Sequence, residues 1–260
     1  MWLNLSLVES LLSTDFVGRR LIYLTSTVST QDIARREAEE GAAAGTVVLA
    51  EEQTAGRGRF GRTWVSPAGT NLYFTLILQP PLSRLRSLSI VAPLAVARAV
   101  RAVSGLDARI KWPNDVLLGG RKFAGVLIET EVAGDAVRYA LIGIGVNVNF
   151  DVIAAPDIAA IATSLKQEAG QDLPREELLA RLLNEFERLY EDSASGANVL
   201  DEWKARLETL GRPVSVSFRD QAYEGVAEDV DRDGSLLLRL ADGSLVTLEA
   251  GEVSLRSPAG

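Results

Sequence analysis

The hydrophobic pattern of the 260-residue chain changes at Gly211. Before this residue, compact apolar runs alternate with longer segments of helical period, of which residues 175–192 are the clearest. After it the chain contains only short alternating runs, separated by turns of the Asp-Gly type. This pattern predicts an α+β fold in two domains. Residues 1–210 would form a mixed β-sheet covered by helices, and residues 211–260 a small β-barrel docked on it.

The expected elements of the first domain are of both kinds. Strands are predicted at residues 20–24, 46–50, 71–78, 108–111, 116–118, 122–131 and 139–148. Helices are predicted at residues 4–12, from Ser29 onward with its hydroxyl as the cap, and at 84–103, 158–169, 175–192 and 198–208. In the second domain, strands are expected at residues 213–218, 222–229, 235–240, 245–248 and 253–255. A barrel of about 50 residues buries too little surface to be very stable alone, which favours docking.

Two residue types are missing from the sequence, and this narrows the chemistry. Without Cys or His there is no thiol nucleophile, no Ser–His pair and no ordinary zinc site. Proton transfer must therefore use Asp, Glu, Lys, Tyr or solvent. The net charge of −8 argues against broad binding of nucleic acid, which depends on Lys and Arg at phosphates. A basic cluster in such an acidic chain indicates a small anionic ligand instead.

The expected location is the cytoplasm, without a membrane partner. No apolar run reaches the roughly 18 residues that a membrane span needs. The first residues lack the basic region of a secretory signal, and acidic Glu9 follows soon after. The lack of cysteine fits a reducing compartment.

A glycine-rich segment carries the strongest functional signal. Gly56, Gly58 and Gly61 fit the G-x-G-x-x-G pattern of dinucleotide-binding proteins, which must follow a strand and open a helix. Here the segment continues into a β-prone run that ends at Pro67, so the structural context of that pattern is absent. The glycines therefore need another explanation.

Three arginines alternate with these glycines and supply that explanation. Arg57, Arg59 and Arg62 are forked donors suited to phosphate and carboxylate, and glycine lets backbone N–H groups approach an anion closely. The segment is thus predicted to be an anion-binding loop. The alternative is a solvated, mobile loop, which the flanking Gln53 and Trp64 disfavour.

The segment Lys111–Asp115, of sequence Lys-Trp-Pro-Asn-Asp, is a second candidate. Pro113 biases the residue before it towards an extended backbone and ends the strand, which presents Lys, Asn and Asp together. Lys111 can neutralise a phosphate, and Asp115 can hold Mg²⁺ directly or through water. The alternative is an ordinary polar turn.

Two further polar residues lie in predicted strands. Lys122 begins a strand that contains Gly125, where a ligand or a neighbouring backbone can approach closely. The alternative for Lys122 is a solvated hairpin lysine. Asn147 follows two glycines in an apolar strand, and a buried Asn needs hydrogen-bond partners. Asn147 is therefore either a satisfied structural residue or one that faces the ligand.

Read in order, these segments resemble the biotin protein ligase family. The matching strings are Val28–Gln31, Gln53–Trp64, Ser66-Pro67, Asn71–Tyr73, Lys111–Asp115, Arg121–Gly125 and Gly143–Asn147. The resemblance covers roughly residues 20–150 by motif, and the C-terminal barrel fits the SH3-like domain of that family. It implies a class II synthetase-like catalytic domain. It also implies ATP and biotin as substrates, Mg²⁺, and a biotin carboxyl carrier domain as partner.

The resemblance also implies roles for individual residues. The biotin site would comprise Ser29, Thr30, Gln31, Gln53, Arg57, Gly58, Arg59 and Lys122. The ATP site would comprise Trp64, Lys111, Asn114 and Asn147, with Asp115 at the metal. The catalytic set would be Arg57, Arg59, Lys111, Lys122 and Asp115. One departure stands out, because the usual Ser-Thr-Asn of the family is Ser29-Thr30-Gln31 here.

The activity implied is two-step biotinylation. Biotin and ATP would give biotinyl-5'-AMP, and the biotin would then pass to a lysine of the carrier domain. Only about 20 residues precede the first catalytic strand, so the DNA-binding domain of bifunctional relatives and a DNA-binding role are not expected. A homodimer is compatible with the sequence. The alternatives are a lipoate or octanoate ligase of related fold and a catalytically idle adenylate-binding module.

Overall fold

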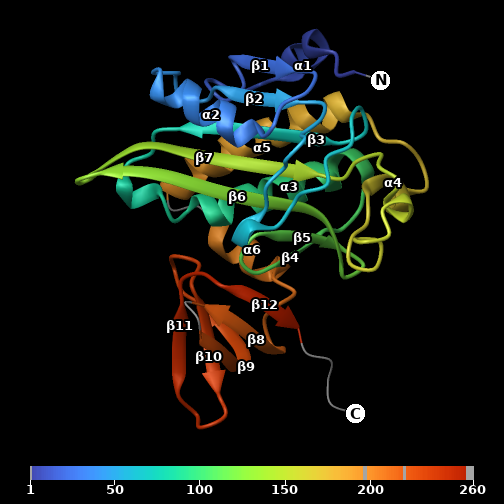
Figure 1. Cartoon of the computed structure of the whole chain (residues 1–260). Helices are drawn as coiled ribbons and strands as arrows, with labels where there is room; N and C mark the ends of the chain where they lie inside the picture. The colour runs from blue at the N-terminus through green and yellow to red at the C-terminus, as the bar shows by residue number, and fades with distance from the viewer. Residues whose placement is uncertain (1, 196–197, 219–220, 256–260) are drawn as a thin grey trace.

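The computed structural model describes residues 2–195, 198–218 and 221–255, which form two β-sheets with covering helices (Figure 1). The larger sheet has seven strands in the order β1-β2-β3-β7-β6-β5-β4. β1 and β2 are parallel and the other neighbours are antiparallel, so the sheet is mixed, as predicted. The strands are β1 (Leu21–Leu24), β2 (Val47–Ala50), β3 (Leu72–Leu78), β4 (Arg109–Lys111), β5 (Asp115–Leu118), β6 (Arg121–Ala133) and β7 (Ala136–Val146).

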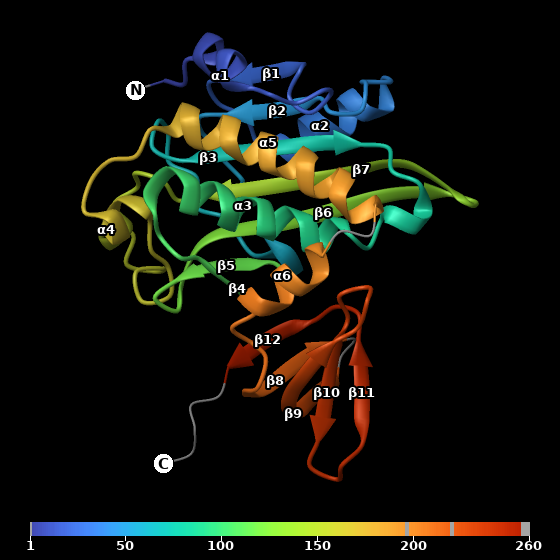
Figure 2. The same cartoon turned by 180° about the vertical axis from the view of Figure 1, so that it is seen from behind.

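Helices cover both faces of this sheet. Figure 2 shows α3 (Leu88–Ser104) and α5 (Arg175–Ala194) side by side across one face. On the other face, α2 (Thr30–Glu39) packs on β2, β3 and β7. The remaining helices are α1 (Leu5–Leu11), α4 (Leu165–Ala169) and α6 (Val199–Arg206), with short 3-10 turns at Arg59–Gly61, Leu82–Arg84 and Val152–Ala154.

Alternating side chains explain why the sheet is buried on two sides. In β2, Val47 and Leu49 belong to the large core under α3 and α5, whereas Val48 joins the small core under α2. In β7, Ile142 and Leu141 divide in the same way. Successive strand residues point to opposite faces, so a strand in a three-layer arrangement must be apolar throughout. This accounts for the compact apolar runs in the sequence.

Two local predictions were wrong. The helix expected at residues 158–169 is only α4, because Ser164 caps it by accepting a hydrogen bond from the backbone N–H of Gln167. The residues before Ser164 instead pair with the start of β6, through Lys122 N–H to Ile161 O and Thr163 N–H to Lys122 O. Ser29 does stand at the N-cap of α2, but its hydroxyl makes no capping bond within the described part of the chain.

The C-terminal region forms a second sheet that is antiparallel throughout, in the order β11-β10-β9-β8-β12. Its strands are β8 (Pro213–Phe218), β9 (Gln221–Val230), β10 (Leu236–Leu240), β11 (Leu245–Leu248) and β12 (Glu252–Leu255). Side chains of Asp231 and Asp242 accept backbone N–H groups in the two tight turns. The predicted α+β class with a small β module is confirmed, and the expected boundary near residue 210 lies between α6 and β8.

The small sheet docks under the β4–β5 end of the large one (Figures 1 and 2). Trp112 connects the two sheets, because its Nε1 donates to Gly234 O at 2.9 Å. Its backbone N–H donates to Thr209 Oγ1, in the segment before β8, at 2.9 Å. Buried residues of both sheets form one continuous core. No helix in residues 2–195, 198–218 and 221–255 is long and apolar enough to cross a membrane.

Candidate functional site

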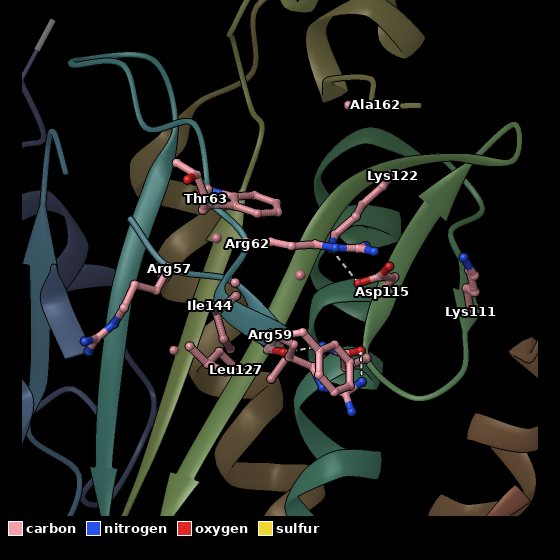
Figure 3. A pocket seen from close by; sticks show the side chains of 18 of the residues that line it. Arg57, Arg59, Arg62, Thr63, Lys111, Asp115, Lys122, Leu127, Ile144 and Ala162 are labelled. Atoms are coloured by element: carbon pink, nitrogen blue, oxygen red, sulfur yellow. Dashed lines mark hydrogen bonds and ion pairs between the residues drawn. The ribbon is translucent and has the colours of Figure 1, made fainter. Parts of the chain in front are cut away.

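A cavity of about 540 Å³ opens on the face of the large sheet that carries α2, beyond the N-terminal end of that helix. Figure 3 shows side chains from the 56–62 loop, β5, β6 and β7 around it. The structure brings all thirteen residues selected from the sequence to the lining of this one cavity. They are Ser29, Thr30, Gln31, Gln53, Arg57, Gly58, Arg59, Trp64, Lys111, Asn114, Asp115, Lys122 and Asn147.

Three glycines of β6 and β7 lie at the base of the cavity and leave room for the side chains above them. A Cβ at Gly145 would lie 2.5 Å from Cε2 of Trp64, and one at Gly125 would lie 3.0 Å from Cε of Lys122. At Gly143 a Cβ would lie 3.1 Å from Cδ of Gln31. The glycines singled out in these strands therefore let large polar side chains lie flat against the sheet.

The arginines of the 56–62 loop have three separate partners. Arg57 pairs with Asp32 of α2 at 2.6 Å, and Figure 3 shows it pointing away from the Lys122–Asp115 pair. Arg62 pairs with Glu252 of β12. Phe60 between them has a left-handed backbone (φ 57°) and an exposed side chain, a conformation that non-glycine residues seldom adopt. The loop is thus tethered at several points around the mouth of the cavity.

Arg59 is the most enclosed of the three arginines. Its Nη1 donates to Asn114 Oδ1 at 3.0 Å and to Gly251 O at 3.2 Å. Burial lowers the pKa of the Arg59 guanidinium, and the nearby carboxylates of Asp115 and Glu252 oppose that shift. Arginine nevertheless stays charged at neutral pH. A half-buried cation at the cavity wall is suited to binding an anion.

One end of the cavity is polar and charged. Lys122 Nζ lies 2.6 Å from Asp115 Oδ1 and 5.2 Å from the centre of the Trp64 ring. Lys111 also lines this end, and its ammonium has no carboxylate partner within 4.0 Å among the described residues. Three cations, Lys111, Lys122 and Arg59, therefore line this end of the cavity together with the carboxylate of Asp115 (Figure 3).

The carboxylates that line the cavity determine how the expected Mg²⁺ could be held there. Residues 2–195, 198–218 and 221–255 contain no group of three or more Asp, Glu, Cys or His side chains that could hold an ion. Asp115 is engaged by Lys122, and the other carboxylate of the cavity, Glu252, by Arg62. Such a site fits Mg²⁺ that is held chiefly by substrate phosphates, with one carboxylate contributed by the protein.

The opposite end of the cavity is lined by amides and hydroxyls. Gln53 Oε1 accepts from the backbone N–H of Thr30 at 2.9 Å and from its hydroxyl at 3.2 Å. Gln53 Nε2 donates to Ser66 Oγ at 3.1 Å. Gln31 Nε2 donates to Leu127 O at 3.4 Å. These bonds hold the start of α2 against the loop and fix a polar wall of uncharged groups.

Asn147 has both structural and site contacts. It is 4% exposed, and its Nδ2 donates to Thr163 O at 3.1 Å while its Oδ1 accepts from Asn71 Nδ2 at 3.4 Å. These bonds join β7 to the segment before α4. The structural interpretation of Asn147 therefore holds, and its place in an ATP site stays a prediction.

Sequence reasoning missed part of the lining. Gly251 and Glu252 of the C-terminal module line the cavity, as do residues 158 and 160–162 and Leu127 of β6. Leu127 could have been found, because it lies two residues from Gly125 and so faces the same side of β6. For Gly251 and Glu252 no local signal exists, since docking of the second sheet alone brings them there.

Known proteins match both the region of the large sheet and the C-terminal module of the chain. The model of the biotin/lipoate A/B protein ligase family matches residues 22–147, and that of the biotin protein ligase C-terminal domain matches residues 209–256. A biotin–[acetyl-CoA-carboxylase] ligase of Mycobacterium tuberculosis is 33% identical over 257 residues, covering 95% of this chain and 93% of its own length. One of Paracoccus denitrificans is 40% identical over 218 residues, covering 79% of this chain and 88% of its own length.

A solved structure agrees with these matches. The biotin protein ligase from Aquifex aeolicus, in complex with biotin and ATP, superposes with a TM-score of 0.79 at 31% identity. The match covers 92% of this chain and 99% of that one. It therefore includes the catalytic sheet and the C-terminal module together. The chain belongs to the biotin protein ligase branch of the biotin/lipoate A/B protein ligase family.

Proposed function

We propose that this member of the family activates biotin with ATP to biotinyl-5'-AMP and transfers the biotin to a lysine of a biotin carboxyl carrier domain. The observation that carries the proposal is the polarity of the cavity. One end offers uncharged hydrogen-bonding groups for a neutral ring, and the other offers three cations for a carboxylate and phosphates. Biotin is a neutral bicyclic ring on an acid chain, so its two ends fit the two ends of the cavity.

The first step requires that anions be held together. An oxygen of the biotin carboxylate forms a bond to the α-phosphorus of ATP, and the bond from that phosphorus to the pyrophosphate oxygen breaks. Lys122, Arg59 and Lys111 would offset the negative charges that otherwise repel each other. The proposed roles need no protein nucleophile, in keeping with a chain that has neither Cys nor His. Mg²⁺ bound to ATP would neutralise phosphate charge, with Asp115 as its ligand from the protein.

The Lys122–Asp115 ion pair supports these roles. With substrates present, the ammonium of Lys122 would exchange the Asp115 carboxylate for the carboxylate or phosphate of the ligand. This exchange replaces one charge pair by another, so Lys122 is never left as an unpaired, half-buried charge. The same exchange would release Asp115 towards a metal.

In the second step, the neutral amine of the acceptor lysine attacks the acyl carbon of the anhydride, and AMP leaves. The amine loses one proton, and Asp115 or solvent would receive it. The proposed assignments of Ser29, Thr30, Gln31, Gln53, Gly58, Trp64, Asn114 and Asn147 to the biotin and ATP sites rest on their place in the cavity lining.

The direct test is incubation of the protein with biotin, MgATP and a biotin carboxyl carrier domain, followed by intact mass spectrometry. We expect the carrier to gain the mass of one biotinyl group, and the gain to need ATP. Parallel reactions with lipoate and octanoate test the related ligases. Labelling by those acids and not by biotin would overturn the proposal, and so would binding of biotin without any transfer.

A further inference from the structure

Lys122 reaches the cavity because β6 is irregular at its start. Ala124 and Lys122 pair with successive residues of β5, which leaves Phe123 between them as the extra residue of a β-bulge. Side chains of a regular strand alternate between its faces, so Lys122 would otherwise share a face with Ala124, which is buried in the large core. The extra residue turns Lys122 to the cavity side, where its side chain lies across Gly125 and is directed at the charged end (Figure 3).

The backbone at this bulge is bonded to other parts of the chain. Lys122 N–H donates to Ile161 O at 3.0 Å, and Thr163 N–H donates to Lys122 O at 2.9 Å. Asn147 N–H donates to Phe123 O at 2.7 Å. The peptide groups on both sides of the Lys122 Cα are therefore fixed by the segment before α4.

Thr163 is the centre of this arrangement, because each of its polar groups is bonded. It is 0% exposed, and besides the bond to Lys122 its carbonyl accepts from Asn147 Nδ2 at 3.1 Å. Its hydroxyl donates to Glu168 Oε1 of α4 at 2.6 Å. The same carboxylate oxygen accepts from Arg121 Nη2 at 2.7 Å, so Glu168 ties Thr163 to the residue before Lys122.

We infer, resting on the function proposed above, that Thr163, anchored by Glu168, is a positioning residue for Lys122 in adenylate formation. Thr163 lies behind the cavity wall and outside its lining, so it acts on the reaction only through the residues that it holds. The ammonium of Lys122 lies 2.6 Å from Asp115 and must meet the substrate anion from nearly the same place. Displacement of a group in a reaction site by about 1 Å can cost roughly 100-fold in rate.

The test is a double-mutant cycle on the rate of pyrophosphate release at saturating biotin and MgATP. Thr163→Val keeps the shape of the side chain and removes the hydroxyl that Glu168 holds. With Lys122 present, we expect this variant to be about 10- to 100-fold slower than the wild type. In the Lys122→Ala background we expect little further loss, because the lysine that the bond positions is no longer there. Thr163→Ser keeps the hydroxyl and should keep the wild-type rate.

Two further variants separate positioning from general stability. Thr46→Val is the matched control, because Thr46 is 1% exposed, lies outside the cavity lining and donates its hydroxyl to Ala43 O at 2.7 Å. It should lower the melting temperature to a similar degree and leave the rate unchanged. Glu168→Ala removes the same bond at a side chain that is 21% exposed, and it serves where Thr163→Val does not fold. It should show the same dependence on Lys122.

The rates are compared at a temperature at which thermal melts show every variant to be folded. Equal fold losses from Thr163→Val with and without Lys122, or a wild-type rate in Thr163→Val, overturn the inference alone. Where Glu168→Ala stands in, the same two outcomes decide. A wild type that releases no pyrophosphate from biotin and MgATP overturns the proposed function as well.

Discussion

At the scale of single residues, the charged end of the cavity combines the carboxylate of Asp115 with the cations Lys111, Lys122 and Arg59. Asp115 holds Lys122 at 2.6 Å, and Arg59 is enclosed between Asn114 and Gly251 O. Lys111 lines the same end. Under the proposed mechanism, Lys111 and Lys122 would lie where negative charge develops in adenylate formation. Among the described residues, Lys122 is paired with a carboxylate and Lys111 is not.

Substitution of these two lysines tests their role. We expect Lys122→Ala and Lys111→Ala each to slow adenylate formation. Removing one charged contact of this kind typically lowers the rate roughly 10²- to 10³-fold. The measurement is pyrophosphate release, and synthetic biotinyl-5'-AMP should partly restore labelling of the carrier. Lys166→Ala is a matched control, because Lys166 is exposed on α4 and pairs with Asp172 outside the cavity. Wild-type pyrophosphate release by both lysine variants would show the assigned roles to be wrong.

A second residue-scale prediction concerns Glu51, which is 0% exposed. Its carboxylate accepts from Arg175 at 2.7 Å, from Tyr23 at 2.7 Å and from the backbone N–H of Leu3 at 2.6 Å. Burial by itself raises the pKa of Glu51, but the hydrogen bonds from Arg175, Leu3 and Tyr23 outweigh it and lower the pKa from its usual value. A carboxyl group whose pKa is lower in the folded state stabilises the fold above its unfolded pKa, and this contribution is lost as pH falls through the folded value.

The variant Glu51→Gln removes the titrating group and keeps an oxygen acceptor. We expect its melting temperature to lie below that of the wild type at pH 7. The difference should shrink as pH falls below about 4.5. Thermal melts of both proteins from pH 7 to pH 3 measure this. A difference that is constant across the range would mean that Glu51 stabilises the fold independently of its charge.

At the scale of elements, the strands were predictable from sequence because the periodicity of each one is local. The compact run at 46–50 and the alternating runs after Gly211 became β2 and the C-terminal strands. The segment 158–163 was not predictable, because its backbone pairs with Lys122, some 40 residues earlier in the chain. Local propensity has no information on such a partner.

The candidate site divides in the same way. Its residues lie in short motifs and could be selected from sequence, and all thirteen line one cavity. Their partners could not be selected, since Arg57 pairs with α2, Arg59 contacts Gly251 and Lys122 pairs with Asp115. These contacts depend on how loop, sheet and C-terminal module pack, which residue types alone do not specify.

The 56–62 loop is expected to become better ordered when the substrates bind. It contains three arginines, and its tethers to Asp32 and Glu252 are ion pairs between partly exposed side chains, which are worth little. We expect trypsin to cleave the free protein in this loop, after Arg57 or Arg62 faster than after the enclosed Arg59. Biotin should slow the cleavage, and biotin with MgATP should slow it more, because the adenylate phosphate gives the arginines and backbone N–H groups a common anion.

Closure of the loop would also shield the anhydride from water. The comparison is limited digestion of the free protein, of the protein with biotin and of the protein with biotin and MgATP, with fragments identified by mass spectrometry. Cleavage elsewhere, such as after Arg20, serves as the internal standard, since Arg20 lies outside the cavity lining. Equal rates in the loop under all three conditions would mean that it does not close over the ligand.

At the scale of the whole molecule, the C-terminal module contributes residues to the lining of the cavity. Gly251 and Glu252 line the cavity, and Trp112, inside the Lys111–Asp115 segment, is 1% exposed and donates to Gly234 O. The segment Lys111–Asp115 is therefore held in place by a contact with the C-terminal module. A change in how the module docks should therefore move Trp112, and with it the side chains of Lys111 and Asp115 at the charged end of the cavity.

Deletion of residues 212–260 tests this arrangement. Exposing buried side chains such as Trp112 costs roughly 1.5–3 kcal/mol each, and each kcal/mol lowers the melting temperature by about 2–4 °C in a protein of this size. We therefore expect a drop of at least about 5 °C, and a loss of turnover larger than the unfolded fraction explains, because Arg59 loses Gly251 O and the cavity loses a wall. Trp112→Phe separates the two effects, since it keeps an aromatic ring in the joint and removes the bond to Gly234 O. It should reduce activity with a smaller change in melting temperature than the deletion causes. Full activity and an unchanged melting temperature after the deletion would instead make the module independent of the catalytic sheet.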